Sequence, residues 1–315
     1  MKISHWILFA ILCCVSLTAV GQKKISYRFA TRAEAQMLIT DIDNFTNKLN
    51  SFDIDLRLGK QDGRKSELLR LAMNETLNWS EDEKKKITAA FKSLQTKIDK
   101  QKLKIKYPQE VILVKTSMKE EMNVAAYTRK NWIALGEKYI NESTNEELEY
   151  LLAHEIFHLL TRSDKVFKKS VYSVIGFNVA DRELFFPIDI IEKRISNPDI
   201  ELYDSYAEFT INGKKQKCSM IIYSQIPFSP EKTLSDYLSV GLIPLNDDLI
   251  PIQNDGKTVI YGIEEAEDFY DMIGRNTKYI INPEEILADN FAYLLIQKKD
   301  LPNPEIPQKI ASILK

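Results

Sequence analysis

The residues whose types and spacing indicate chemistry are His154, Glu155 and His158, which form the pattern His-Glu-x-x-His. On an α-helix, side chains four residues apart lie one turn above each other, so both imidazoles can face one metal ion. Glu155 lies about 100° round the helix from His154, where its carboxylate can take a proton from a metal-bound water without being a ligand. The pattern therefore predicts a hydrolytic zinc (Zn2+) site with Glu155 as the base.

The segment that carries this motif has the features of a buried helix. Ser143 with Glu146, or Thr144 with Glu147, forms a capping box at its start. Apolar residues then recur at helical spacing, at Leu148, Leu151, Leu152, Ile156 and Leu159. Two ordinary buried histidines would also fit such a helix, but the complete pattern is more typical of a metal site.

Composition limits which residues can complete the site. The chain of 315 residues has three histidines, and His5 lies in a segment that we expect to be removed. A catalytic zinc usually takes three protein ligands and keeps a fourth position for water. With no further histidine available, the third ligand must be a carboxylate or, less favourably, Cys218.

A second predicted helix supplies the carboxylates. Asn282 as N-cap and Pro283 at the first helical position are typical of a helix start. Glu285 and Asp289 are four apart on one face, so Glu285 can bind the metal while Asp289 accepts the second N–H of a ligand histidine. Glu284 is the adjacent alternative ligand. Both glutamates would also suit the first turn of a helix that binds no metal.

Residues 154–158, followed far downstream by the Glu-x-x-x-Asp pattern of residues 285–289, resemble the gluzincins, the thermolysin-like class of zinc metallopeptidases. The resemblance covers the two helices. It implies a zincin-like fold, a peptide or protein substrate and hydrolysis of peptide bonds. It also implies that the zinc ligands are His154, His158 and Glu285. Glu155 would then be the base, and Asp289 would hold a ligand histidine.

Two features depart from the thermolysin pattern. The two helices are separated by a long stretch, residues 163–280, and no histidine remains to stabilise the oxyanion. That role would fall to a tyrosine or an arginine. The candidates, unranked, are Arg162, Tyr172, Arg182 and Tyr279.

Residues 1–21 are predicted to be a signal peptide. Lys2 provides a short positive region, an apolar run extends from Trp6 to Val20, and residues 19–21 place small side chains where a signal peptidase cleaves. We expect an exported protein, periplasmic or secreted, with no stable membrane span after cleavage. Cleavage would leave Cys218 as the last cysteine and exclude an internal disulfide.

Residues 22–108 are predicted to form an N-terminal helical region. Helical periodicity covers residues 31–49 and 64–77, and a third helix begins at Ser80, with Glu83 as its capping partner. Nothing in this region indicates chemistry.

Residues 109–315 are predicted to form the metallopeptidase domain, in an α+β fold. A β-branched strand at 110–115 and one or two strands within 123–135 precede the motif helix. The insertion, at about 163–280, contains two predicted hairpins and a short helix, and we expect it to pack on or over the site. The hairpin turns are Asn212-Gly213 and Asp255-Gly256, and the helix covers residues 263–273 and ends at Gly274.

The formal net charge of −2 gives no electrostatic footprint for nucleic acid or an anionic membrane, so such partners are disfavoured. The alternative to an enzyme is a non-catalytic exported binding protein with a structural metal or a degenerate site. Cys218 as a fourth ligand would favour that alternative, because structural sites are fully liganded.

Overall fold

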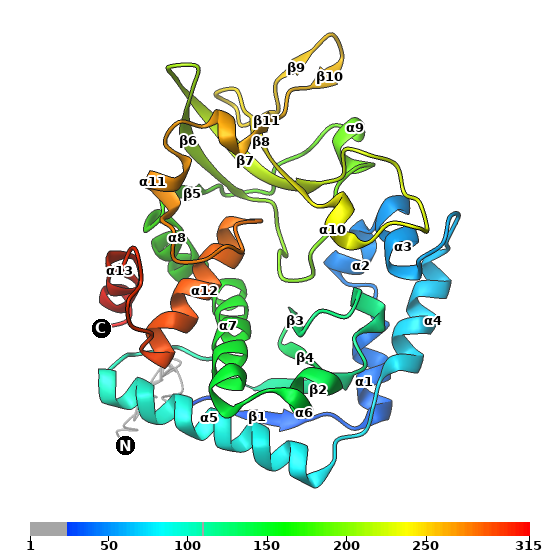
Figure 1. The fold of residues 1–315 in the computed structure, drawn as a ribbon, viewed down its shortest axis with the longest axis vertical. Coiled ribbons are helices and arrows are strands. Elements are labelled where there is room, and N and C mark those ends of the chain that lie inside the picture. The colour runs from blue at the N-terminus through cyan, green and yellow to red at the C-terminus, as the bar shows by residue number, and fades with distance from the viewer. Residues whose placement is uncertain (1–23, 109) are drawn as a thin grey trace, which may run out of the picture.

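The computed structural model describes residues 24–108 and 110–315, and the predicted signal peptide lies outside them. The fold is α+β, as the sequence predicts, with a four-stranded sheet, a five-stranded sheet and helices around both (Figure 1). Within the described residues, no helix has the length and apolar character that crossing a membrane requires.

The N-terminal part contains a short strand and five helices. In order these are β1 (Tyr27–Phe29), α1 (Arg32–Ile39), α2 (Asn44–Lys48), α3 (Ser51–Leu58), α4 (Lys65–Glu75) and α5 (Glu81–Gln101). The capping box of Ser80 and Glu83 starts α5 as predicted. The single helix predicted over residues 31–49 is wrong, because Asp43 caps a new helix by accepting from Thr46 N.

The first sheet has the order β1-β2-β4-β3. Its other strands are β2 (Val111–Thr116), β3 (Ala126–Arg129) and β4 (Trp132–Gly136), with a short 3₁₀ turn, η1 (Lys119–Glu121), before β3. Strands β1 and β4 run parallel to β2, whereas β3 is antiparallel to β4 and forms an edge. Because β1 pairs with β2 and α5 packs on the motif helix, the residues before and after 108 share a sheet and a buried core.

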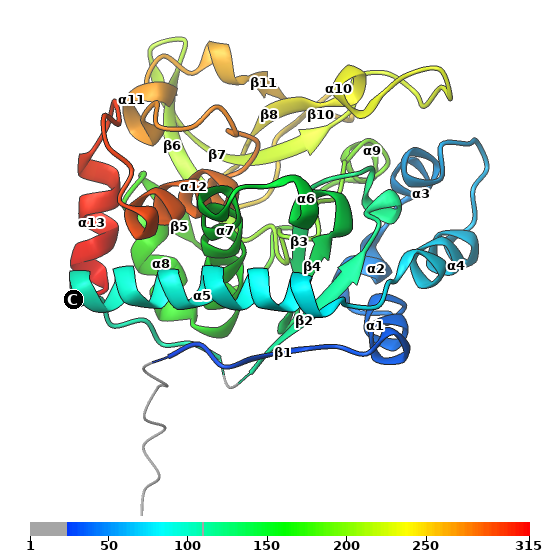
Figure 2. The ribbon, with the colours of Figure 1, turned by 60° about the horizontal axis from the view of Figure 1, so that its bottom comes forward.

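The motif helix is α7 (Asn145–Ser163), which follows α6 (Glu137–Glu142). Thr144 is its N-cap and forms the capping box with Glu147. The second predicted helix is α12 (Pro283–Ile296), where the Asn282 side chain accepts from Glu284 N and Pro283 begins the helix, as expected. The two helices pack side by side, and α5 lies across α7 (Figures 1 and 2). Helices α8 (Lys165–Ser173) and α13 (Glu305–Ile313) pack against α12.

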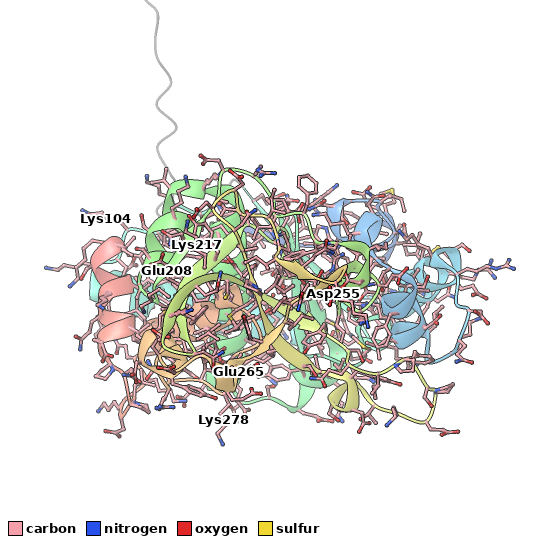
Figure 3. The ribbon with its side chains drawn as sticks, turned by 90° about the horizontal axis from the view of Figure 1, so that it is seen from above. Lys104, Glu208, Lys217, Asp255, Glu265 and Lys278 are labelled. Carbon is pink, nitrogen blue, oxygen red and sulfur yellow. The ribbon has the colours of Figure 1, made fainter. Side chains whose placement is uncertain are left out.

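The stretch between α8 and α12 forms an antiparallel sheet of order β11-β8-β7-β6-β5. Its strands are β5 (Phe177–Val179), β6 (Ser205–Ile211), β7 (Lys214–Tyr223), β8 (Ser239–Pro244) and β11 (Tyr261–Gly262), and the other elements are α9 (Ile188–Ile191), α10 (Leu234–Tyr237), β9 (Gln253–Asn254) and β10 (Lys257–Thr258). Both predicted hairpins are confirmed, β6–β7 and β9–β10. Seen from above, this part carries side chains of both signs, among them Glu208, Lys217, Asp255 and Glu265 (Figure 3).

The helix predicted over residues 263–273 is broken into η2 (Ile263–Glu265) and α11 (Phe269–Ile273). The break occurs because Asp268 accepts from Thr210 N, at 2.8 Å, and Lys215 Nζ, at 2.7 Å, on the β6–β7 hairpin. Gly274 ends α11 with a positive φ of 74°, as its position predicted.

Candidate metal centre

The packing of α7 on α12 brings the three predicted ligands together. His154, His158 and Glu285 each place one ligand atom within 4.8 Å of the other two, and all three residues are buried. Glu285 Oε2 lies 3.0 Å from His154 Nε2 and 3.7 Å from His158 Nε2. Two imidazole nitrogens and a carboxylate oxygen therefore converge on one point, and this group could hold a metal ion.

The outer nitrogen of each histidine contacts a carboxylate. His154 Nδ1 lies 2.9 Å from Asp289 Oδ1, and His158 Nδ1 lies 3.0 Å from Glu284 Oε1. A carboxylate on Nδ1 favours the tautomer that leaves the Nε2 lone pair free for a metal. Asp289 thus lies where its predicted role requires. The geometry also distinguishes the two glutamates as candidate ligands. Glu285 lies near the Nε2 atoms of both histidines, whereas Glu284 contacts Nδ1 of His158.

His158 Nε2 provides a test of whether the site fits a metal ion. This atom is buried and has no hydrogen-bond partner, and the His158 side chain is 0% exposed. Leaving a buried polar atom without a partner costs about 1–3 kcal/mol. A metal ion between His158 and Glu285 would satisfy it, and the donor set of two histidines and one glutamate is typical of catalytic zinc.

Several hydroxyl groups hold the outer carboxylates. Asp289 also accepts from Tyr150 and Thr277, and Glu284 accepts from Thr161 and Tyr172, both at 2.5 Å. Sequence reasoning missed all four contacts and considered Tyr172 only for the oxyanion. Tyr150 and Thr161 could have been found, since they lie four residues before His154 and three after His158 on one helix. Thr277 lies in a loop and has no such local indication.

Glu155, the predicted base, is buried next to the ligands. Thr128 on the edge strand β3 donates its hydroxyl to Glu155 Oε2 at 2.6 Å. Burial, together with the nearby carboxylate of Asp199, raises the pKa of Glu155 to about 7, although both histidines act in the opposite direction. A carboxylate that titrates near neutral pH is suited to accept and return a proton.

The four candidates for oxyanion stabilisation differ in the partners that their side chains already have. Tyr172 donates to Glu284, Arg182 donates to Asp248 O and Arg162 donates to Pro198 O. Tyr279 instead places its ring 6.4 Å from that of His154, centroid to centroid, and is 44% exposed. Partial burial and nearby carboxylates, Glu285 first, raise the pKa of Tyr279 well above its usual value, so its hydroxyl remains a donor.

Cys218 does not take part in the centre. It lies in β7 opposite Ala207, where it is fully buried. Burial raises the pKa of its thiol to about 12. Within the described part of the chain, neither group of side chains that could hold a metal includes Cys218.

The second such group is Glu155, His158 and Asp199, whose ligand atoms also lie within 4.8 Å of one another. Asp199 comes from the loop between α9 and β6. Its Oδ1 accepts from Thr128 N at 2.6 Å, and two residues earlier Asn197 Nδ2 donates to Glu285 Oε1 at 2.5 Å. Neither residue was predicted, because nothing local in the sequence marks the loop.

Comparison of the chain with family models, with curated proteins and with solved structures found no match. Function must therefore be inferred from the site itself.

Proposed function

We propose that this chain is an exported zinc-dependent metallopeptidase of the gluzincin type, which hydrolyses peptide bonds. One observation carries the proposal: both imidazoles turn Nε2 toward Glu285 while their Nδ1 atoms contact Asp289 and Glu284. Histidines that serve only the core do not need a shared carboxylate on one side and a separate carboxylate on the other. Ligand histidines need both, for binding and for orientation.

The proposed roles follow from the contacts. Zinc held by His154, His158 and Glu285 would polarise the scissile carbonyl and lower the pKa of bound water to about 7. Glu155, steadied by Thr128, takes the proton of the attacking water and passes it to the departing amine. Tyr279 donates its hydroxyl to the carbonyl oxygen as negative charge develops there.

The edge strand β3 supports a peptide as the substrate. An extended peptide binds by adding to the free edge of a sheet. Strand β3 pairs only with β4 in its sheet and lies beside α7, so its outer edge adjoins the metal centre.

Metal content and turnover test the proposal together. We expect about one zinc per chain in the parent and in Glu155→Gln, and a loss of zinc in Glu285→Ala, measured by elemental analysis after dialysis. Glu155→Gln should lower the rate of casein or peptide cleavage by about 10²- to 10⁴-fold, the usual contribution of a general base. Glu149→Gln, the same substitution on the same helix at a glutamate that pairs with Lys97, is the matched control.

The outcomes separate the parts of the proposal. Absence of zinc from the parent, even after reconstitution, would refute the metal site. Zinc in the parent with undiminished cleavage by Glu155→Gln would refute the assignment of the base.

A further inference from the structure

The loop between α9 and β6 contacts the metal centre at two points. In Figure 1 it descends from the second sheet toward β3. Asn197 donates to one oxygen of Glu285, and Asp199 accepts the backbone N–H of Thr128. Residues 198–200 are buried, so this segment packs against the rest of the protein and is not exposed to solvent.

Asp199 lies where a reacting group would have to be. Its carboxylate is within 4.8 Å of a ligand atom of His158 and of a Glu155 oxygen. A water that gives its proton to Glu155 must lie between that carboxylate and the ligand atoms. The Asp199 oxygens compete for the same space. His158 Nε2, buried and without a hydrogen-bond partner, is the atom that a metal between these groups would satisfy.

Asp199 also occupies a backbone donor that a substrate needs. A peptide that adds to the edge of β3 would place its carbonyl oxygens on the N–H groups of that strand. Asp199 Oδ1 lies 2.6 Å from Thr128 N and so stands in for such a carbonyl oxygen. The loop thereby blocks both the water position and the edge of the sheet.

Helix α3 holds this loop in place. The Asp53 carboxylate accepts from Ser196 N and Ser196 Oγ, both at 2.7 Å, and Arg57 Nη2 donates to Ser196 O at 2.7 Å. The side chains of Asp53 and Arg57 are 0% exposed, and Arg57 also pairs with Glu121. Within the described residues no ion pair holds Asp199, so buried charged residues anchor the loop at Ser196, and single hydrogen bonds join Asn197 and Asp199 to the centre.

We infer that residues 197–199 act as a built-in pseudo-substrate that keeps the site latent, with Asp199 as the group that closes the metal's open position. The inference rests on the proposed function, because it requires a metal at His154, His158 and Glu285. The loop is anchored by the N-terminal helices, which links that part of the chain to control of the site.

Cobalt(II) with acetohydroxamate, a small bidentate metal ligand, tests the inference without peptide turnover. The full mature chain is loaded with Co2+, and hydroxamate binding is followed by the visible absorption of the cobalt. A site whose competent state is populated at 0.1–10% shows an apparent Kd that is about 10- to 1000-fold too weak. We therefore expect Asp199→Ala to bind hydroxamate at least 10-fold more tightly than the parent.

Two further variants complete the design. Asp199→Asn keeps an acceptor for Thr128 N but loses the charge, and it should give an intermediate affinity; it also serves if the alanine variant does not fold. Asp189→Ala is the matched control, because Asp189 lies in the same insertion and accepts from Thr258 N at 2.9 Å, away from the centre. It should bind hydroxamate as the parent does.

The cobalt spectrum tests the metal site, and the hydroxamate titration tests the latch, so the two hypotheses can be refuted separately. Binding of Co2+ by every chain, with equal hydroxamate affinity in the parent and both Asp199 variants, would overturn the latch and leave the metal site standing. Absence of bound Co2+ from the parent and from Asp199→Ala would overturn the proposed function, and the latch with it.

Discussion

Replacing Asp289 by Asn should weaken zinc binding without removing any ligand. Asp289 contacts His154 Nδ1 at 2.9 Å and is 4% exposed, so its negative charge acts on the imidazole with little screening. Asn preserves the shape and an acceptor oxygen but removes the charge. Groups that orient ligand histidines typically contribute 10- to 100-fold to metal affinity, which is about 1.4–2.7 kcal/mol.

This loss is measurable as thermal stability. At a free zinc concentration 100 times the parent's Kd, bound metal stabilises the parent by about 2.7 kcal/mol. A variant that binds 100-fold more weakly retains only about 0.4 kcal/mol at that concentration, by the same relation. The rise in melting temperature on adding zinc should therefore shrink strongly, and competition with a chromophoric chelator gives the Kd directly.

Asp204→Asn is the control, because Asp204 is an equally buried carboxylate that pairs with Lys168 at 2.7 Å and contacts neither histidine. It should change the stability of the metal-free chain but not the zinc affinity. Zinc affinity of Asp289→Asn within twofold of the parent would refute the reasoning, and would make the His154–Asp289 contact an ordinary buried ion pair.

Two further predictions concern single side chains. Burial raises the pKa of Glu120 from 4.5 to about 7; the folded chain then binds more protons than the unfolded chain between these values, so stability falls as pH rises through this window. At pH 8 the penalty from Glu120 is about 3 kcal/mol. Glu120→Gln should therefore reduce the fall in stability between pH 5 and pH 8, measured by urea unfolding, and an unchanged fall would contradict the prediction. Tyr279→Phe should lower kcat by about 10²- to 10³-fold with little change in KM, and a change in KM alone would make Tyr279 a substrate contact instead.

The helices of the site could be predicted because their determinants are local. Thr144 with Glu147 caps α7, and Asn282 with Pro283 starts α12. The ligand spacing then follows from the helical period. The failure at residues 263–273 has the opposite cause, since a contact with a distant residue, Asp268 with Thr210, breaks the helical pattern. At residues 31–49 the local cap Asp43 was overlooked.

The residues around the ligands were less predictable. Tyr172, considered only as a stabiliser of the oxyanion, instead donates to Glu284. Asn197, Asp199 and Thr277 reach the centre from loops, and no periodicity relates a loop residue to a helix in three dimensions. Only the folded chain reveals these contacts.

The charges around the centre give an independent reason to expect a cation. Five carboxylates, each at most 9% exposed, surround two imidazoles: Glu155, Asp199, Glu284, Glu285 and Asp289. Even with both histidines protonated, the carboxylates would exceed the cations by three charges, and Arg162 compensates at most one of them. Burying unpaired charge is costly, so such groups neutralise or bind a metal. The raised pKa values of Glu155 and Asp199 show the first response. A divalent cation at His154 and His158 would supply the second, which is why metal binding should stabilise this chain.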